Sequence, residues 1–321
     1  MKISVVIPTY KRTLLLMECL AALARQRFPH DEFEVIVVSD GPDRLTRQIV
    51  DSWCHTRLLD VTYLPLSENR GPAAARNAGW KLASGELIAF TDDDTQPDPH
   101  WLSELWENAA GQPPAAYTGR IIVPITEAPT DYELNTAQLE TAEFVTANCA
   151  CSRTVLESTG GFDERYRMAW REDSDLYFSI RSAGFPVEHI PEAIVVHPVR
   201  KATWGVSFRE QKKTMFNALL FRKFPDLYRK EPHPFPPGHY YAMALLLPAA
   251  FVCAAFGETE WAAVLFGGWA GLIAMFAVKR LRRTSRSWAH VLEMMLTSAT
   301  IPPASIFWYW YGWWKFRLTK G

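Results

Sequence analysis

The sequence predicts an α/β domain with a doubly wound sheet, followed by an α-helical membrane hairpin and an aromatic-rich C-terminal segment. Short apolar runs alternate with helical patterns as far as about residue 110. Two long apolar runs without charged residues follow position 235, and tryptophan and tyrosine then crowd the end of the chain. We therefore expect a globular domain over residues 1–230 with halves at 1–110 and 111–230, two membrane helices within 240–278, and a separate segment at 288–321.

The first half alternates buried-type strands with helices. Strands are expected where apolar residues run without interruption, and helices where they recur every three or four positions, as Leu16, Leu20 and Leu23 do. Proline at position 72 fits the first turn of a helix. The expected strands are Ile3–Ile7, Phe33–Val38, Val61–Leu64 and Leu87–Thr91, and the expected helices are Leu14–Arg25, Leu45–Cys54, Gly71–Ala83 and Pro99–Ala109. This alternation predicts a Rossmann-like mixed sheet, mostly parallel, with helices on both faces.

Composition argues against several classes of protein. The formal net charge of −1 gives no basic footprint for nucleic acid. No G-x-G-x-x-G follows the first strand, which disfavours a dinucleotide-binding dehydrogenase. The five cysteines form no C-x-x-C motif, so we expect reduced thiols and no zinc site. Met1 and Lys2 lead straight into a strand, so we expect no signal peptide.

Two apolar runs in the second part have the length of membrane spans. Tyr240–Phe256 and Trp261–Val278 contain no charged residue, and each suffices to cross a hydrocarbon core of about 30 Å. Only Gly257–Glu260 separates them, and a basic cluster, Lys279–Arg286, follows. Because positive residues favour the cytoplasmic side, we expect the hairpin to return the chain to the cytoplasm, where the first domain also lies. The alternative is a pair of buried helices in a soluble domain, although soluble helices seldom lack charges over this length.

A third apolar segment, Val291–Trp314, carries Pro302-Pro303, which we expect to break it. Its end, Phe307–Trp314, has the composition of an interfacial aromatic belt. Lys315 follows, and a third full span would carry that cation away from the cytoplasm. We therefore favour a re-entrant or interfacial segment over a third membrane helix.

Acidic residues gather just after the fourth expected strand. Asp92–Asp94 follow Leu87–Phe90, and carboxylates this close repel one another unless they are solvated or share a cation. A second acidic group stands at Glu172–Asp175. Polar loops also follow the first two strands, at Pro8–Tyr10 and Asp40-Gly41, and the carboxyl ends of parallel strands meet at one edge of a sheet. We expect a ligand site at that edge; the alternative for Asp92–Asp94 alone is a solvated acidic turn.

Five sequence elements occur in a fixed order. They are Val5–Arg12, a strand and loop; Asn69–Gly79, which reads N-x-G-x-x-x-A-R-N-x-G; Phe90–Pro97, an acidic stretch; Gly160–Glu164; and Glu172–Leu176. Together they resemble the inverting family 2 glycosyltransferases, which have the GT-A fold. The resemblance covers roughly residues 1–230 and implies an enzyme with a nucleotide-binding half at 1–110 and an acceptor half at 111–230.

The resemblance implies a divalent cation, Mn²⁺ or Mg²⁺, as cofactor. Asp94 is the expected ligand, Asp92 faces the ribose or shares the metal, and His197 completes the metal shell or touches the diphosphate. A lone histidine at a strand end is more often structural. For Asp40 and Arg76 the alternatives are a turn-forming Asp-Gly and a surface charge. The residues expected to bind the nucleotide sugar are Pro8, Thr9, Tyr10, Arg12, Asp40, Arg76, Asp92 and Asp93.

Inversion at a sugar carbon requires a base that takes the proton of the attacking hydroxyl. The resemblance assigns this role to Asp173, with Glu172 beside it to hold the acceptor or to raise the pKa of its neighbour. The alternative is an acid-rich helix N-terminus favoured by the helix dipole. The expected acceptor-side residues are Asn148, Gly161, Phe162, Asp163 and Trp170.

Processive members of the family carry a Q-x-x-R-W element, but Gln211 lacks the following Arg-Trp, which predicts transfer of a single sugar. We expect a hexose-type unit to move from a nucleotide sugar, a UDP-sugar, to a lipid or lipid-linked glycan. We also expect an integral protein of the bacterial inner membrane with its catalytic domain in the cytoplasm. The alternatives are a polyprenyl-phosphate sugar synthase, whose acceptor is the phosphate itself, and a catalytically silent membrane scaffold. The sequence leaves the oligomeric state open.

Overall fold

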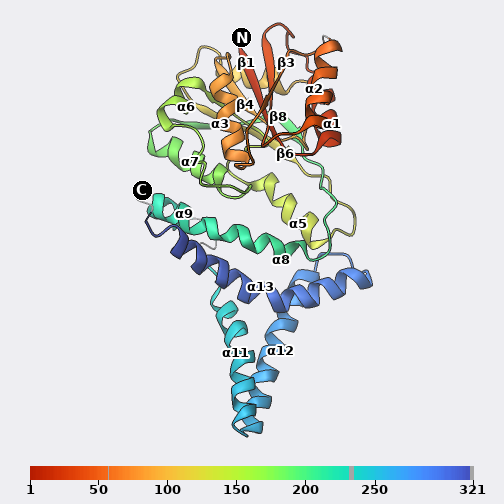
Figure 1. Ribbon diagram of the computed structural model, residues 1–321, viewed down its shortest axis with the longest axis vertical. Coiled ribbons are helices and arrows are strands. Elements are labelled where there is room, and N and C mark those ends of the chain that lie inside the picture. The colour runs from red at the N-terminus through yellow and green to blue at the C-terminus, as the bar shows by residue number, and fades with distance from the viewer. Residues whose placement is uncertain (57, 231–234, 319–321) are drawn as a thin grey trace. The chain divides into compact units, whose positions relative to one another are not determined.

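The computed structural model describes residues 1–56, 58–230 and 235–318. The chain divides into two compact units (Figure 1). Unit 1 contains Met1–Pro124 and Ala137–Val199, and unit 2 contains Ile125–Thr136 and Arg200–Gly321. Residues of the expected 1–230 domain therefore occur in both units, because a short insertion and the stretch after Val199 pack with the C-terminal helices.

Unit 1 is built on an eight-stranded mixed sheet with the order β3-β2-β1-β4-β7-β6-β8-β5. The strands are β1 (Ile3–Thr9), β2 (Phe33–Ser39), β3 (Val61–Pro65), β4 (Leu87–Phe90), β5 (Gln96–Pro97), β6 (Ala116–Ile122), β7 (Cys149–Ser152) and β8 (Val187–Val196). Strands β3, β2, β1 and β4 are parallel, and β7 enters antiparallel between β4 and β6. Strand β8 runs parallel to β6 and antiparallel to β5. The predicted mixed sheet is confirmed.

Helices cover both faces of this sheet (Figure 1). They are α1 (Thr13–Leu23), α2 (Arg44–Thr56), α3 (Pro72–Leu82), α4 (Trp101–Ala109), α6 (Arg153–Thr159) and α7 (Glu172–Ser182), with a 3₁₀ turn at Gln138–Thr141. Helices α1, α2 and α4 share one core with Val5 of β1, while α3, α6 and α7 share the other with Val6. Because adjacent residues of a strand point to opposite faces of the sheet, the apolar strands contribute side chains to both cores.

Unit 2 is helical. It comprises α5 (Asp131–Ala137), α8 (Val206–Glu210), a 3₁₀ segment η2 (Gln211–Met215), α9 (Phe216–Lys223), α10 (Pro225–Tyr228), α11 (Gly238–Ala255), α12 (Thr259–Leu281) and α13 (Trp288–Lys315). Helices α11 and α12 contact each other along a hairpin, and both are long and apolar enough to cross a membrane. Helix α13 contacts α8, η2 and α9, which run beside it in Figure 1.

Helix α13 contradicts one prediction. It runs unbroken from Trp288 to Lys315 with Pro302 and Pro303 inside it, so the expected break at the prolines is wrong. The prolines remove two helical N–H donors, but a continuous buried face from His290 to Gly312 holds the helix by packing. The last three residues of the expected 288–321 segment lie outside the described residues.

A buried ionic contact ties the insertion of unit 2 to its long helices. Arg280, in the last turn of α12, donates to Asp131 Oδ2 at 2.7 Å, and both side chains are largely buried. The same guanidinium donates to Thr297 Oγ1 at 2.7 Å and to Ser298 Oγ at 3.1 Å on α13. Ser207 at the start of α8 donates to Asp131 as well. Four helices of unit 2 thus meet at one satisfied polar cluster.

Candidate functional site

The loops after β1, β2 and β4 meet at one edge of the sheet in unit 1. The backbone N–H of Asp40 donates to Thr9 O at 2.9 Å, and Thr9 Oγ1 donates to Asp93 Oδ2 at 2.6 Å. Arg12 donates to Asp93 Oδ1 at 3.0 Å, while Pro8 lies inside β1. Burial raises the pKa of Asp93 to about 6, although the charge of Arg12 and the hydrogen bond from Thr9 oppose that rise. The expected convergence of the three loops is confirmed, and Asp93 joins two of them.

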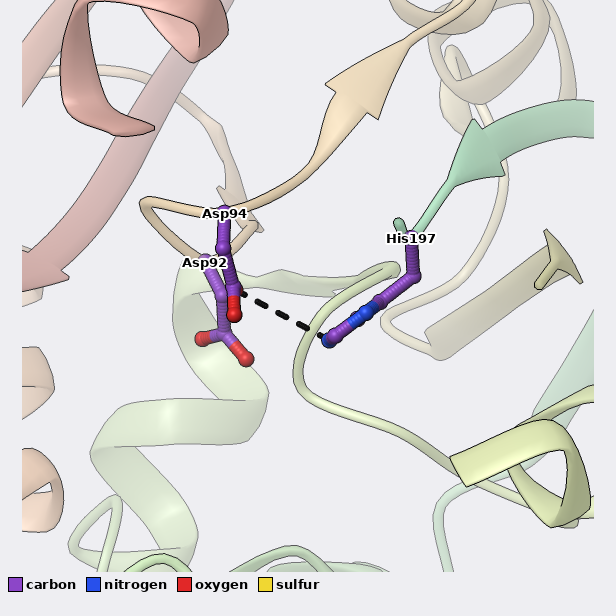
Figure 2. A group of neighbouring side chains, drawn as sticks. All are labelled: Asp92, Asp94 and His197. Atoms are coloured by element: carbon purple, nitrogen blue, oxygen red, sulfur yellow. Dashed lines mark ion pairs between the residues drawn. The ribbon is translucent and has the colours of Figure 1, made fainter. Parts of the chain in front are cut away.

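Asp92, Asp94 and His197 face one another beside this junction (Figure 2). One ligand atom from each lies within 4.8 Å of the others, and His197 Nε2 is 3.7 Å from Asp94 Oδ1. Two segments far apart in sequence supply them. Strand β5 begins two residues after Asp94 and pairs antiparallel with β8, where Gln96 stands opposite Val196. This register places His197, the next residue after β8, beside the carboxylates.

The three side chains fit a divalent cation. Ligand atoms that share an ion with bonds of about 2.1 Å lie roughly 3 to 4 Å apart, so small side-chain rotations suffice. His197 and Asp94 are both buried, which favours a bound cation as the compensation for the acidic charge. Carboxylate oxygens suit both Mg²⁺ and Mn²⁺, whereas imidazole suits transition metals better. The three ligands therefore fit either Mn²⁺ or Mg²⁺.

Arg76 connects these carboxylates to the second acidic group. It comes from α3, is 2% exposed, and donates to Asp92 Oδ1 at 2.7 Å and to Glu172 Oε1 at 3.2 Å. Its guanidinium also lies 5.6 Å from the ring centre of Phe162. Burial alone would raise the pKa of Asp92, but the charge and hydrogen bond of Arg76 outweigh burial and lower it. The surface-charge alternative for Arg76 is wrong, because the side chain is the cation of a buried acidic cluster.

Glu172 and Asp173 open helix α7. The residue before them, Arg171, adopts a left-handed backbone conformation at φ 73°, which turns the chain into the helix. Burial, and next the charge of Asp173, raises the pKa of Glu172 to about 7 against the opposing charge of Arg76. Burial also raises the pKa of Asp173, whose Oδ1 accepts the N–H of Ser174 at 2.7 Å. Within the described residues, Glu172 Oε2 is buried and accepts no hydrogen bond.

Asn77 is a positioning residue that the sequence reasoning missed. Its Oδ1 accepts the N–H of Phe162 and the indole N–H of Trp80, both at 2.9 Å, and its Nδ2 donates to Phe162 O and to Glu164 Oε1. Gly161 has φ 73°, and a Cβ there would lie 2.5 Å from Trp80 Nε1. Asn77 therefore fastens the 161–164 loop to α3. Its position next to Arg76 in the quoted motif was the available signal.

Three other expected site residues, Trp170, Tyr10 and Asp163, lie in loops of unit 1. Trp170 is 41% exposed, and the guanidinium of Arg171 lies 5.3 Å from its ring centre. Tyr10 is 38% exposed. Asp163 pairs with Arg165 two residues later. The side-chain amine of Lys11 lies 5.1 Å from the ring centre of Tyr10, and the roles of Trp170 and Tyr10 towards a substrate stay predictions.

Asp40 is fixed by the start of helix α3. Its Oδ1 accepts the N–H of Arg70 at 2.7 Å, and its Oδ2 accepts Asn69 Nδ2 and the N–H of Gly71, both at 2.9 Å. The carboxylate therefore holds the β2 loop to the loop before α3. The expected contact of Asp40 to the nucleotide sugar stays a prediction.

The structure gives Asn148 a different place from the expected one. It is fully buried, donates to Arg120 O at 2.9 Å and to Ala193 O at 2.8 Å, and accepts the indole N–H of Trp101 at 2.8 Å. Its polar atoms are engaged inside the domain, where they join β6, β8 and α4. We correct the acceptor-side assignment of Asn148 to a structural one.

Comparisons with known proteins show which proteins this chain resembles. Over 272 residues, the chain is 28% identical to "Validoxylamine A glucosyltransferase" of Streptomyces hygroscopicus subsp. jinggangensis, an alignment covering 70% of this chain and 61% of that protein. Over 94 residues it is 42% identical to "Poly(ribitol-phosphate) beta-N-acetylglucosaminyltransferase TarS" of Staphylococcus aureus, covering 29% and 16%. The chain spans about three fifths of the length of the validoxylamine transferases that it matches.

Solved structures support the fold. The mannosyltransferase PcManGT from Pyrobaculum calidifontis, in complex with GDP-Man and Mn²⁺, has a TM-score of 0.61 at 22% identity, covering 98% of this chain and 87% of that one. S. aureus TarS 1-349 in complex with UDP has a TM-score of 0.52 at 19% identity, covering 96% and 92%. The sheet domain is of the expected GT-A type. The model of the family "Glycosyl transferase family 2" matches residues 4–168, about half of the chain, and the chain belongs to that family.

Proposed function

We propose that the protein is a metal-dependent, inverting glycosyltransferase that moves a single sugar from a nucleotide sugar to an acceptor hydroxyl. One observation carries this proposal. Arg76 bonds Asp92 of the cation cluster and Glu172 beside the candidate base in a single buried contact. The carboxylates suited to binding the leaving diphosphate through a cation are therefore held next to the carboxylates suited to an attacking hydroxyl.

The side chains divide the chemistry between them. Asp92, Asp94 and His197 would hold a divalent cation, which would neutralise charge on the leaving diphosphate. Asp173 accepts the proton of the attacking hydroxyl, and its raised pKa makes it a better base than a solvated aspartate. Glu172, with a pKa of about 7, is able to donate or accept a hydrogen bond through Oε2 and orients the acceptor.

We propose a UDP-sugar as the donor. Asp40, Thr9 and Tyr10 stand at the strand ends where nucleotides bind doubly wound sheets. The TarS complex with UDP supports a uridine nucleotide as the donor. Because PcManGT was solved with GDP-Man, the test also includes guanosine diphosphate sugars for comparison.

We propose a lipid or lipid-linked glycan as the acceptor and the bacterial inner membrane as the location, with unit 1 in the cytoplasm. Helices α11 and α12 support this, because they have the length and hydropathy of membrane spans and little of either is buried. The basic cluster at the end of α12 favours a cytoplasmic position for that end. Tethering places the enzyme where lipid acceptors concentrate.

The test is a donor panel with the purified full chain, Mn²⁺ and lipid extract, reading released nucleoside diphosphate and labelled lipid. We expect one UDP-sugar to react and Asp94→Asn to abolish the reaction, with Glu107→Gln, an exposed acid on α4, as the matched control. Transfer unchanged by chelation, or by Asp94→Asn, would overturn the metal assignment. Transfer to polyprenyl phosphate that survives Asp173→Asn would replace the hydroxyl acceptor by a phosphate.

A further inference from the structure

Helix α13 has a buried face and, on the opposite side, a set of exposed apolar residues. Its buried face repeats every three or four residues and comprises His290, Met294, Thr297, Ser298, Ile301, Pro302, Ser305, Tyr309 and Gly312. A second set, which we call the outer stripe, comprises Trp288, Leu292, Met295, Leu296, Phe307, Trp310 and Trp314. Its members are between 46% and 81% exposed. A helix needs only one apolar face to pack on its own protein, so the outer stripe requires a separate explanation.

The buried face packs on the rest of unit 2. Gly312 lies so close to Met215 of η2 that a Cβ would approach its carbonyl oxygen to 2.2 Å. Tyr309 contacts Trp313 and Phe235 through its ring. At 100° per residue, the outer stripe points about half a turn away from this face. The stripe therefore faces away from η2 and α9.

Helix α13 meets the α11–α12 hairpin at the end of α12. Within unit 2, α13 runs across the direction of the α11–α12 hairpin, with α8 and α9 on one side of it and the hairpin on the other (Figure 1). Arg280, in the last turn of α12, fixes that junction by donating to Thr297 of α13. A bilayer crossed by the hairpin would therefore have its surface at the level of α13.

Cations flank the outer stripe at both ends. Arg282, Arg283 and Arg286 precede Trp288 and are exposed, and Arg317 follows Trp314 with its guanidinium 5.2 Å from that ring centre. Arginine and tryptophan together at the edge of an apolar surface are typical of the lipid headgroup level. The positive charge at both ends of the outer stripe indicates anionic lipids as the partner.

We propose that α13 lies in the plane of the bilayer surface, with the outer stripe at the boundary between headgroups and acyl chains and its flanking arginines on anionic phospholipids. This inference rests on the membrane attachment in the proposed function. It adds a second, lateral contact, so that the hairpin and α13 together hold unit 2 to the membrane in one orientation.

The test measures depth along the stripe. Nitroxide labels are placed by Leu292→Cys, Leu296→Cys, Phe307→Cys and Trp314→Cys, one at a time, in the full chain carrying Cys54→Ser and Cys253→Ser. The protein is reconstituted in nanodiscs containing phosphatidylglycerol. Power saturation with oxygen and with a water-soluble nickel complex gives each label a depth. Phe266→Cys on α12 is the lipid control and Glu107→Cys on α4 is the aqueous control.

A helix in the surface plane gives all four labels the same depth, within roughly 5 Å, just below the phosphates. A spanning α13 would spread them, because Leu292 and Trp314 lie about 33 Å apart along a helix, and such a gradient overturns the inference. Labels shielded from both relaxants while Phe266→Cys is in lipid indicate a covering protein, such as a second copy, and also overturn it. If the α12 label is itself in water, the membrane attachment in the proposed function has failed.

Discussion

Replacing Arg76 by methionine tests the buried bridge at the site. The methionine keeps much of the apolar volume of the arginine stem but removes the cation between Asp92 and Glu172. The side chain of Arg76 is 2% exposed and that of Glu172 5%, so water cannot replace the lost partner. We expect Arg76→Met to destabilise unit 1 and to do so in a pH-dependent way.

The size of the loss follows from burial. Removing one partner of a buried ion pair leaves the other uncompensated and costs about 3–5 kcal/mol. For a domain of this size each kcal/mol shifts Tm by about 3 °C, so the variant should unfold on the order of 10 °C lower than the parent.

The sign of the pH dependence follows from Glu172. Its pKa is about 7 in the folded protein against 4.5 for an ordinary glutamate, so the folded state binds the proton more tightly. The contribution of this group to stability is present at low pH and is lost as pH rises from about 4.5 to about 7. Without Arg76 the pKa of Glu172 rises further and the loss extends above pH 7. The Tm deficit of Arg76→Met is therefore larger at about pH 8.5 than at about pH 6.

The assay is thermal unfolding of the detergent-purified full chain, followed by intrinsic fluorescence at both pH values. Arg76→Lys keeps the charge but not the two-armed geometry and should lose less. In the Arg76→Met background, Glu172→Gln removes the stranded carboxylate and should recover part of the deficit, most at high pH. A deficit equal at both pH values, or one that Glu172→Gln deepens, would refute the reasoning.

Three further predictions use the same unfolding assay. Gly161→Ala places a Cβ against Trp80 at φ 73° and should cost about 2–4 kcal/mol, whereas Gly160→Ala, with open space around it, should cost only the backbone strain of about 1–2 kcal/mol. Asn148→Ala strands two backbone carbonyls and an indole N–H and should cost about 3 kcal/mol; a neutral result would contradict the structural role of Asn148. Asp131→Asn leaves Arg280 without its charged partner and should lower the Tm of unit 2. Because the pair is buried, added salt should not change the size of this loss, and a loss that disappears at high salt would contradict the reasoning.

Sequence periodicity was sufficient for the parallel half of the sheet. Most positions of β1, β2 and β4 are apolar and buried, so the alternation of strands with helices and the convergence of the strands' carboxyl ends could be deduced. Helices α11 and α12 were equally visible from their lack of charge. The continuation of α13 through Pro302 and Pro303 could not be predicted, because it depends on the packing of the buried face and not on local helix propensity.

The hydrogen-bond and ion-pair partners of polar side chains were harder to predict from the sequence. Arg76 and Glu172 are joined across 96 positions of sequence, so no local pattern distinguishes a buried bridge from two surface charges. Asn148 stands at the start of β7 in the middle of the sheet, where its side chain closes a gap between strands that the sequence does not place next to each other. Motifs indicated which residue types matter, while the tertiary fold decided whether each faces a ligand or the interior.

The histidine of the cation cluster shows why a two-residue strand matters. Asp92 and Asp94 follow β4, but β8, which leads to His197, lies three places away from β4 in the sheet. The chain closes this distance by turning after the acidic run into β5, whose Gln96 and Pro97 pair with Val196 and Val195 of β8. Because β5 leaves the acidic turn directly, it carries that turn to the end of β8, and the imidazole meets the carboxylates there. Strand β5 is too short to be detected by periodicity. The sequence alone therefore leaves His197 between a structural and a metal-binding role, whereas the pairing of β5 with β8 places its imidazole beside the carboxylates.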